Sequence, residues 1–223
     1  MRDKTQRRII VLSACDSSAE PTVAARQLRI SCAIAHDFAD AVAAYSRLSA
    51  TQAPKVELAE LKTRQGAPQQ AEPTSLVLVR PLSTNDAHTG MPSEAIEHIV
   101  KSIPRSNEPL IYVVAYGDAA PSASDRQALA ALRPDIERMG ANWGGALFLG
   151  GAETFEHLYR LPRLGAYRRP ISQAIDLLVC AARLGEPLEK AMRSIGHEDP
   201  RSLVCAQPGL YPILRLHQAI WHR

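Results

Sequence analysis

The stretch from Leu110 to Gly151 constrains the fold more than any other part of this chain. An apolar run (LIYVVAYG) ends at Gly117, a segment with helical periodicity follows, and a second apolar run (NWGGALFLG) ends at Gly150. This order predicts a strand, a helix and a second strand. Two strands joined by a long helical crossover lie parallel in one sheet. Because parallel sheets bind ligands at the carboxyl ends of their strands, the turns that follow these strands are where we expect function.

Apolar runs along the rest of the chain extend the same pattern. Continuous or alternating apolar residues predict strands at 7–14, 55–61, 75–81, 109–116 and 143–150. Apolar residues at helical spacing predict helices at 22–48, 93–103, 122–139 and 171–184. Strands that alternate with helices predict an α/β fold, a three-layer α/β/α sandwich around a five-stranded parallel sheet. We expect a single domain over 1–223, with a helical extension from about 186 to 223.

The helix predicted at 122–139 carries its own boundary signals. Ser122 and Asp125 have the spacing of a capping box, with Asp in place of the usual Glu or Gln, and Gly140 suits a C-cap. Pro134 falls inside this helix, where it removes a hydrogen bond. We therefore expect either a kink or two short helices.

The composition is that of an ordinary globular domain. The chain has 223 residues, of which 46% are hydrophobic and 22% are charged, and a net charge of +3. A charge of this size does not by itself indicate nucleic acid, and we expect no such partner. No apolar run approaches the roughly 20 residues that cross a bilayer, and the charged N-terminus does not resemble a signal peptide. We expect a cytoplasmic protein with no membrane contact.

Metal-binding patterns are absent from the sequence. The chain has four cysteines, Cys15, Cys32, Cys180 and Cys205. None forms a C-x-x-C pair, and no histidine cluster completes a zinc pattern, so we expect no metal. His36, Asp37 and Asp40 form a polar cluster on the first long helix, either a weak chelator or a solvated helix face.

Several enzyme classes do not fit the chain. Cys15 precedes a helix, as the nucleophile of cysteine-dependent phosphatases does, but Pro21 stands where those enzymes need arginine. There is no G-x-G-x-x-G after a strand, no G-x-x-x-x-G-K-[ST] and no G-x-S-x-G. These absences argue against a dinucleotide-binding Rossmann domain, a P-loop NTPase and an α/β-hydrolase. No side chain is predicted to be a catalytic acid, base or nucleophile.

Three segments, taken in chain order, resemble one family. Residues 81–103 (PLSTNDAHTGMPSEAIEHIVKSI) resemble its P-L-Y-V-D-x-L-P-x-x-L-x-x-F-L segment. Residues 141–153 (ANWGGALFLGGAE) are similar to its W-G-G-G-L-x-I-G-G-G-E segment, and residues 208–223 to its P-x-x-P-R-x-x-Y-x-x-x-A-N-x-x-W tail. The family that these segments resemble is the flavodoxin-like NAD(P)H-dependent FMN reductases, a group of NAD(P)H-dependent oxidoreductases.

The resemblance implies a sheet in the order 2-1-3-4-5, with FMN above the ends of the first, third and fourth strands. It also implies NAD(P)H as co-substrate, a small-molecule substrate or electron acceptor, and a homodimer. The protein would position the flavin, and the flavin would carry the hydride chemistry.

The loop after the first strand is the predicted phosphate site, because the first helix begins there. Its hydroxyl side chains are Ser13, Ser17, Ser18 and Thr22. It departs from the family's N-G-S-P-R loop, since it has no glycine and no basic residue and contains Asp16 and Glu20. Two carboxylates repel a phosphate unless they point away or cap the helix. A helix N-cap formed by Asp16, Ser17 or Ser18 is the alternative to phosphate binding.

Two further loops are predicted to bind the flavin ring. They contribute Pro81, Leu82, Ser83, Thr84 and Asn85 after the third strand, and Tyr116, Gly117 and Asp118 after the fourth. Ser83 replaces the family's aromatic residue. His88 either donates to a flavin carbonyl or is a solvated loop histidine, and Tyr116 either stacks on the ring or is buried beside Val114.

The sequence thus leaves two hypotheses. The first is a flavodoxin-like, FMN-binding NAD(P)H-dependent oxidoreductase. The second is a degenerate flavodoxin-like module without flavin, which binds a ligand or a partner at the same strand ends. Residues 152–169, rich in arginine, are a predicted lid or dimer contact.

Overall fold

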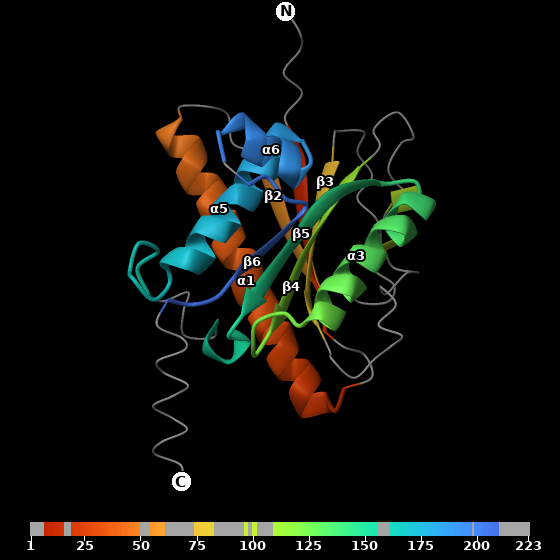
Figure 1. The fold of residues 1–223 in the computed structure, drawn as a ribbon, viewed down its shortest axis with the longest axis vertical. Coiled ribbons are helices and arrows are strands. Elements are labelled where there is room, and N and C mark those ends of the chain that lie inside the picture. Colours follow the sequence, from red (N-terminus) through yellow and green to blue (C-terminus); the bar gives the residue numbers. More distant parts are fainter. Residues whose placement is uncertain are drawn as a thin grey trace, which may run out of the picture.

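One parallel sheet organises the molecule (Figure 1). The computed structural model describes residues 7–15, 19–49, 54–60, 74–82, 96–97, 100–101, 109–155, 161–197 and 199–209. The strands are β1 (Arg8–Ser13), β2 (Lys55–Glu60), β3 (Thr74–Pro81), β4 (Leu110–Gly117), β5 (Asn142–Gly150) and β6 (Leu203–Ala206). The helices are α1 (Pro21–Leu48), α3 (Ala123–Arg138), α5 (Arg169–Leu184) and α6 (Leu188–Ser194), with a short 3-10 turn, η1 (Ala152–Thr154).

The sheet has six strands in the order β2-β1-β3-β4-β5-β6, and every neighbouring pair is parallel. The α/β class and the order of the first five strands are as predicted. The prediction of five strands was wrong, because the four-residue strand β6 adds to β5 from a tail that was expected to be helical. In that tail α6 is a helix, and residues 210–223 lie outside the described part of the chain.

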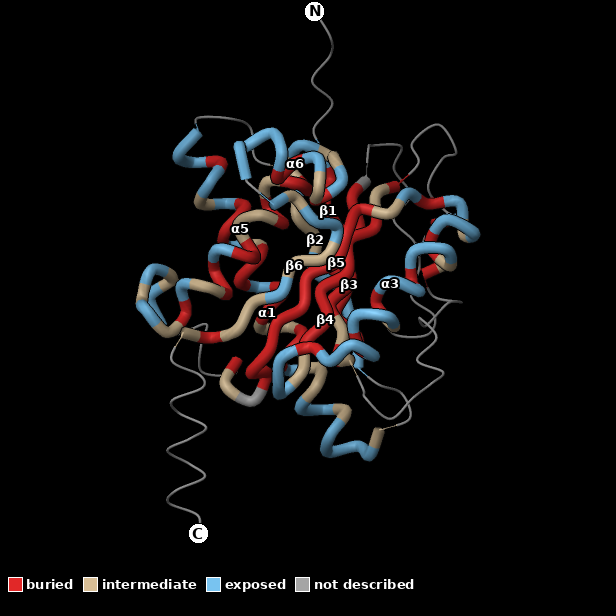
Figure 2. Tube along the Cα trace, in the orientation of Figure 1, coloured by how far each residue is buried: buried red, intermediate tan, exposed pale blue. Residues whose placement is uncertain are grey.

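Helices cover both faces of the sheet. Ile9 and Val11 of β1 pack toward α1, α5 and α6, whereas Ile10 and Leu12 pack toward α3, as the alternation of a strand requires. The central strands are buried along nearly their whole length (Figure 2). Of the helix predicted at 93–103, the described residues Ile96 and Val100 are helical and buried on the α3 side.

The edge strand β2 is charged and largely exposed. Glu57 of β2 forms ion pairs with Arg8 and, at 2.9 Å, with Lys55. The bond to Arg8 is the main cause that holds the pKa of Glu57 below its ordinary value.

Helix α1 is long enough to extend beyond the sheet. It has 28 residues, about 42 Å at 1.5 Å per residue, whereas an eight-residue strand spans about 27 Å. Residues 21–29 are mostly exposed, and burial begins at Ile30. The first turns of α1 therefore stand past the carboxyl edge of the sheet (Figure 1).

Helix α3 begins as predicted and continues through its proline. The Ser122 side chain accepts from the Asp125 N–H, and the Asp125 carboxylate accepts from the Ser122 N–H, which completes the capping box. The helix is one element with Pro134 inside it, so the expectation of two short helices was wrong. Pro134 and Ala130 are both exposed, and water can satisfy the Ala130 carbonyl, which has no N–H from Pro134.

A buried ion cluster joins residues 161–168 to α1. Asp37 of α1 is 9% exposed and pairs with Arg168, which is 5% exposed, and with Arg163 at 2.6 Å. Arg163 also contacts Asp176 of α5 at 2.5 Å. Asp37 thus belongs to the interior, so the solvated helix face expected for it was wrong.

Candidate functional site

A cavity of about 320 Å³ lies at the carboxyl edge of the sheet. Its walls are the protruding turns of α1, the ends of β3, β4 and β5, and the turn that leads into α3. The described residues that line it are Val23, Arg26, Gln27, Ile30, Pro81, Leu82, Tyr116, Gly117, Asp118, Ala119, Ala120, Asp125, Phe148 and Ala152. This is the edge at which parallel sheets bind ligands.

The structure brings together five of the residues that the sequence predicts. These are Pro81, Leu82, Tyr116, Gly117 and Asp118, from two strands that pair in the sheet. Two more predicted residues are not among the lining residues: Ser13 is buried at the end of β1, and Thr22 is exposed in the first turn of α1.

The remaining predicted site residues, Ser17, Ser18, Ser83, Thr84 and Asn85, lie outside the described part of the chain, as do Asp16 and His88. Glu20 is described: it is the N-cap residue of α1, and its side chain makes no capping hydrogen bond. Whether Asp16, Ser17 or Ser18 contributes to the start of α1 or to a phosphate site stays a prediction.

Tyr116 forms a buried wall of the cavity. Its hydroxyl donates to the Gln27 carbonyl oxygen at 2.6 Å and lies 3.0 Å from the Ser31 hydroxyl, which in turn donates to the Ala14 carbonyl oxygen at 2.7 Å. The sequence left two alternatives for Tyr116, stacking on the ring or burial beside Val114. Only 3% of Tyr116 is exposed, so the structure agrees with burial. Burial raises the pKa of the Tyr116 phenol well above its ordinary value, which argues against an acid–base role near neutral pH.

Arg26 supplies a positive charge that was not predicted from the sequence. It lies on the α1 face of the cavity, and among the described residues nothing forms an ion pair or hydrogen bond with its guanidinium. Val23, Arg26, Gln27 and Ile30 follow one another at helical spacing, which puts them on one side of α1. That spacing was available in the sequence, whereas the exposure of the helix start was known only from the structure.

Two carboxylates, those of Asp118 and Asp125, lie at the cavity. Asp125 accepts hydrogen bonds from the Ser122 N–H and the Ser122 hydroxyl, both at 2.8 Å. Its charge is directed at the start of α3, where the helix dipole favours it. Asp118 is exposed at the rim. The cavity therefore presents one free cation and one rim carboxylate among its described charged residues.

The residues that line the cavity are of the chemical types that FMN binding requires. Ile30, Leu82 and Phe148 give an apolar surface, and the turn 117–120 gives main-chain polar groups beside it. Gly117 lies against the Phe148 ring, since a Cβ there would come within 3.2 Å of its Cζ atom. Arginine binds phosphate through parallel N–H bonds, and ligand sites of about 300–1,000 Å³ are typical. The volume of 320 Å³ is at the small end of that range.

Other kinds of site are not seen in the described residues. No group of three or more His, Cys, Asp or Glu side chains among them could hold a metal ion. Within the same ranges, no helix combines the length and the apolar character that crossing a membrane requires.

Comparison with known proteins adds one structure. No family model matches the chain, and no curated protein does. A crystal structure of an oxidoreductase from Corynebacterium diphtheriae is similar over 80% of this chain and 97% of its own, at 16% identity and a TM-score of 0.43. The fold assignment rests instead on the strand order and layers described above.

Proposed function

We propose that this chain binds FMN in the cavity at the carboxyl edge and acts as a flavodoxin-like NAD(P)H-dependent oxidoreductase. The observation that carries the proposal is the guanidinium of Arg26, which has no ion-pair or hydrogen-bond partner among the described residues and lies beside an apolar wall at this edge. A basic residue is what the loop after β1 lacks, and α1 supplies one from the side.

Each wall has a role in this proposal. Arg26 would hold the FMN phosphate, Ile30, Leu82 and Phe148 would contact the ring system, and the main chain of 117–120 would bond the ring edge. Bound FMN would supply the hydride-transfer chemistry between NAD(P)H and a small-molecule acceptor. Tyr116 shapes the cavity and takes no proton, because its buried phenol keeps its hydrogen. The homodimer and the cytoplasmic location stay predictions.

An FMN titration followed by flavin fluorescence tests the proposal. We expect saturable binding, weakened at least tenfold by Arg26→Gln, since a charge-assisted bond is worth about 1.5–3 kcal/mol. Arg47→Gln, an exposed arginine in the last turn of α1, is the matched control and should bind like the wild type. A folded protein that binds no FMN would overturn the proposal and favour the flavin-free module. Binding without NAD(P)H oxidation would overturn only the enzymatic part.

A further inference from the structure

Strand β6 is the last strand at one edge of the sheet, and no other described strand pairs with its outer side. It pairs with β5 in the register Ala146↔Leu203 to Leu149↔Ala206, and the Ala146 N–H donates to the Ser202 carbonyl oxygen at 2.7 Å. In a parallel pair alternate residues bond the neighbour, so Leu203 and Cys205 turn their N–H and C=O groups outward. No backbone hydrogen bond from another described residue reaches these outward groups.

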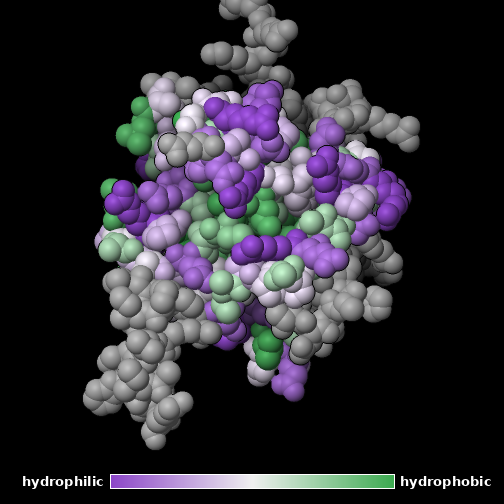
Figure 3. All heavy atoms as spheres, viewed as in Figure 1, coloured by the Kyte–Doolittle hydropathy of each residue, from purple (hydrophilic) through white to green (hydrophobic). Residues whose placement is uncertain are grey.

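A groove of about 590 Å³ runs along this open edge. Its apolar lining comes from both faces of the sheet: Leu177 of α5, Met192 of α6, and Leu203, Val204 and Cys205 of β6. Figure 3 shows a hydrophobic area in the middle of this side of the molecule, bordered by hydrophilic side chains. An edge strand with an apolar lining is a template for another strand.

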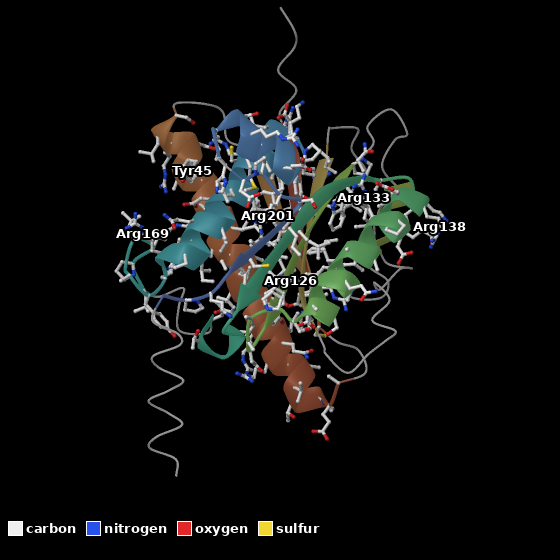
Figure 4. The ribbon with its side chains drawn as sticks, viewed as in Figure 1. Tyr45, Arg126, Arg133, Arg138, Arg169 and Arg201 are labelled. Carbon is white, nitrogen blue, oxygen red and sulfur yellow. The ribbon has the colours of Figure 1, made fainter. Side chains whose placement is uncertain are left out.

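The described residues at the rim of the groove carry a net positive charge. Arg126, in the first turns of α3, and Arg201, just before β6, both line it, and Figure 4 shows the two side chains close to β6. Asp199, which also lines the groove, pairs with Arg201. The Arg126 side chain has no ion-pair or hydrogen-bond partner among the described residues, so the described lining keeps a net positive charge. His197 lines the groove as well. The charge of the rim calls for an acidic occupant.

We propose that β6 docks an extended acidic segment of a partner protein, which adds to the sheet as a seventh strand. Main-chain bonds to Leu203 and Cys205 would hold the segment, its apolar side chains would fill the groove, and its carboxylates would meet Arg126 and Arg201. Strand addition of this kind takes affinity from the backbone and specificity from alternate side chains.

Charge argues against two other occupants. The chain's own last residues, 210–223, contain Arg215 and Arg223 and no Asp or Glu. If a second copy paired its β6 with this β6 about a two-fold axis, the same rim of both copies would lie at the contact. Arginine would then face arginine. Like charges across a strand pair are destabilising.

The probe is a fluorescent peptide that alternates Glu and Val over seven residues, and binding is followed by anisotropy. We expect saturable binding that weakens at least tenfold when every peptide nitrogen is methylated, because strand pairing needs those N–H donors. A matched Lys–Val peptide should not bind. The double variant R126Q/R201Q should bind the Glu–Val peptide at least tenfold more weakly, whereas R138Q, at the far end of α3, should bind like the wild type.

Two results would overturn the proposal. Equal binding of the methylated and unmethylated peptides would show that charge alone attracts them. A protein that sediments as a dimer and binds the peptide only after dissociation would identify the occupant as a second copy. Circular dichroism of the double variant confirms that it is folded, and the substituted arginines are exposed, so loss of binding is not loss of structure.

Discussion

The Tyr116 hydroxyl donates to the main-chain oxygen of Gln27 at 2.6 Å, across 89 residues of sequence. The bond joins the end of β4 to the part of α1 where burial gives way to exposure. It therefore holds the protruding turns of α1 against the sheet. These turns carry Arg26, so this contact between a strand and a helix helps to set the shape of the cavity.

Tyr116→Phe removes this hydroxyl and little else. We expect the free energy of unfolding in urea to fall by about 1 kcal/mol, the usual net worth of an internal hydrogen bond. The same variant should loosen the wall that bears Arg26 and weaken FMN binding. Tyr167→Phe is the control, because the Tyr167 hydroxyl makes no hydrogen bond among the described residues. Equal destabilisation by both substitutions would contradict the role given to Tyr116.

Burial of Tyr112 and Tyr116 predicts a loss of stability in alkali. Burial raises the pKa of both phenols above the ordinary value of 10.0. Their contribution is complete below pH 10, and it is lost as the pH rises from there toward the native pKa, because the unfolded chain releases its protons first. The slope is about 1.4 kcal/mol per pH unit for each tyrosine. Urea midpoints between pH 8 and 11 should fall less steeply for Tyr112→Phe, and an unchanged slope would contradict the prediction.

Asp37→Asn leaves the buried guanidinium of Arg168 without its carboxylate. Removing one partner of a buried ion pair lowers the free energy of unfolding by about 3–5 kcal/mol, so the melting temperature should fall markedly. The control is Glu137→Gln in the exposed pair with Arg133, which should change stability by less than about 0.5 kcal/mol. If both variants have the same melting temperature, the Asp37 cluster does not anchor residues 161–168.

Ser122→Ala should destabilise α3 through its cap. Loss of an N-cap side chain costs about 1 kcal/mol, whereas Ser122→Gly should cost only a few tenths. The alanine variant also removes a donor from Asp125, so its carboxylate becomes freer to repel a phosphate in the cavity. Chemical denaturation separates the two variants, and FMN titration tests the electrostatic effect. Equal stabilities of the alanine and glycine variants would count against the cap.

The periodicity of the chain was enough to predict most of the fold. The strands β1 to β5 and the helices α1, α3 and α5 lie within a few residues of the expected ranges, because long apolar runs and helical stripes reflect burial directly. Strand β6 was missed because four residues, LVCA, cannot be told from a turn of helix by their pattern. Pro134 was expected either to kink α3 or to divide it into two short helices; the helix is one element, because the exposed position of Pro134 makes the lost bond tolerable.

Contacts between distant residues were beyond the sequence. Arg26 appears as one more surface arginine until α1 is known to pass the end of the sheet. Asp37 looks like a solvated helix residue until Arg163 and Arg168 are brought to it from more than 120 positions away. Pairings of this kind depend on topology, which a single sequence expresses only through its loops and periods.

The two edge strands of the sheet, β2 and β6, differ in charge, and this difference bears on how further strands can add to the sheet. Strand β2 bears Lys55, Glu57 and Glu60 along its exposed edge, a charge pattern that discourages a further strand. Among the described residues, the β2 edge therefore does not match the surface that we propose for strand addition at β6. A complex built as proposed would have one partner segment per chain.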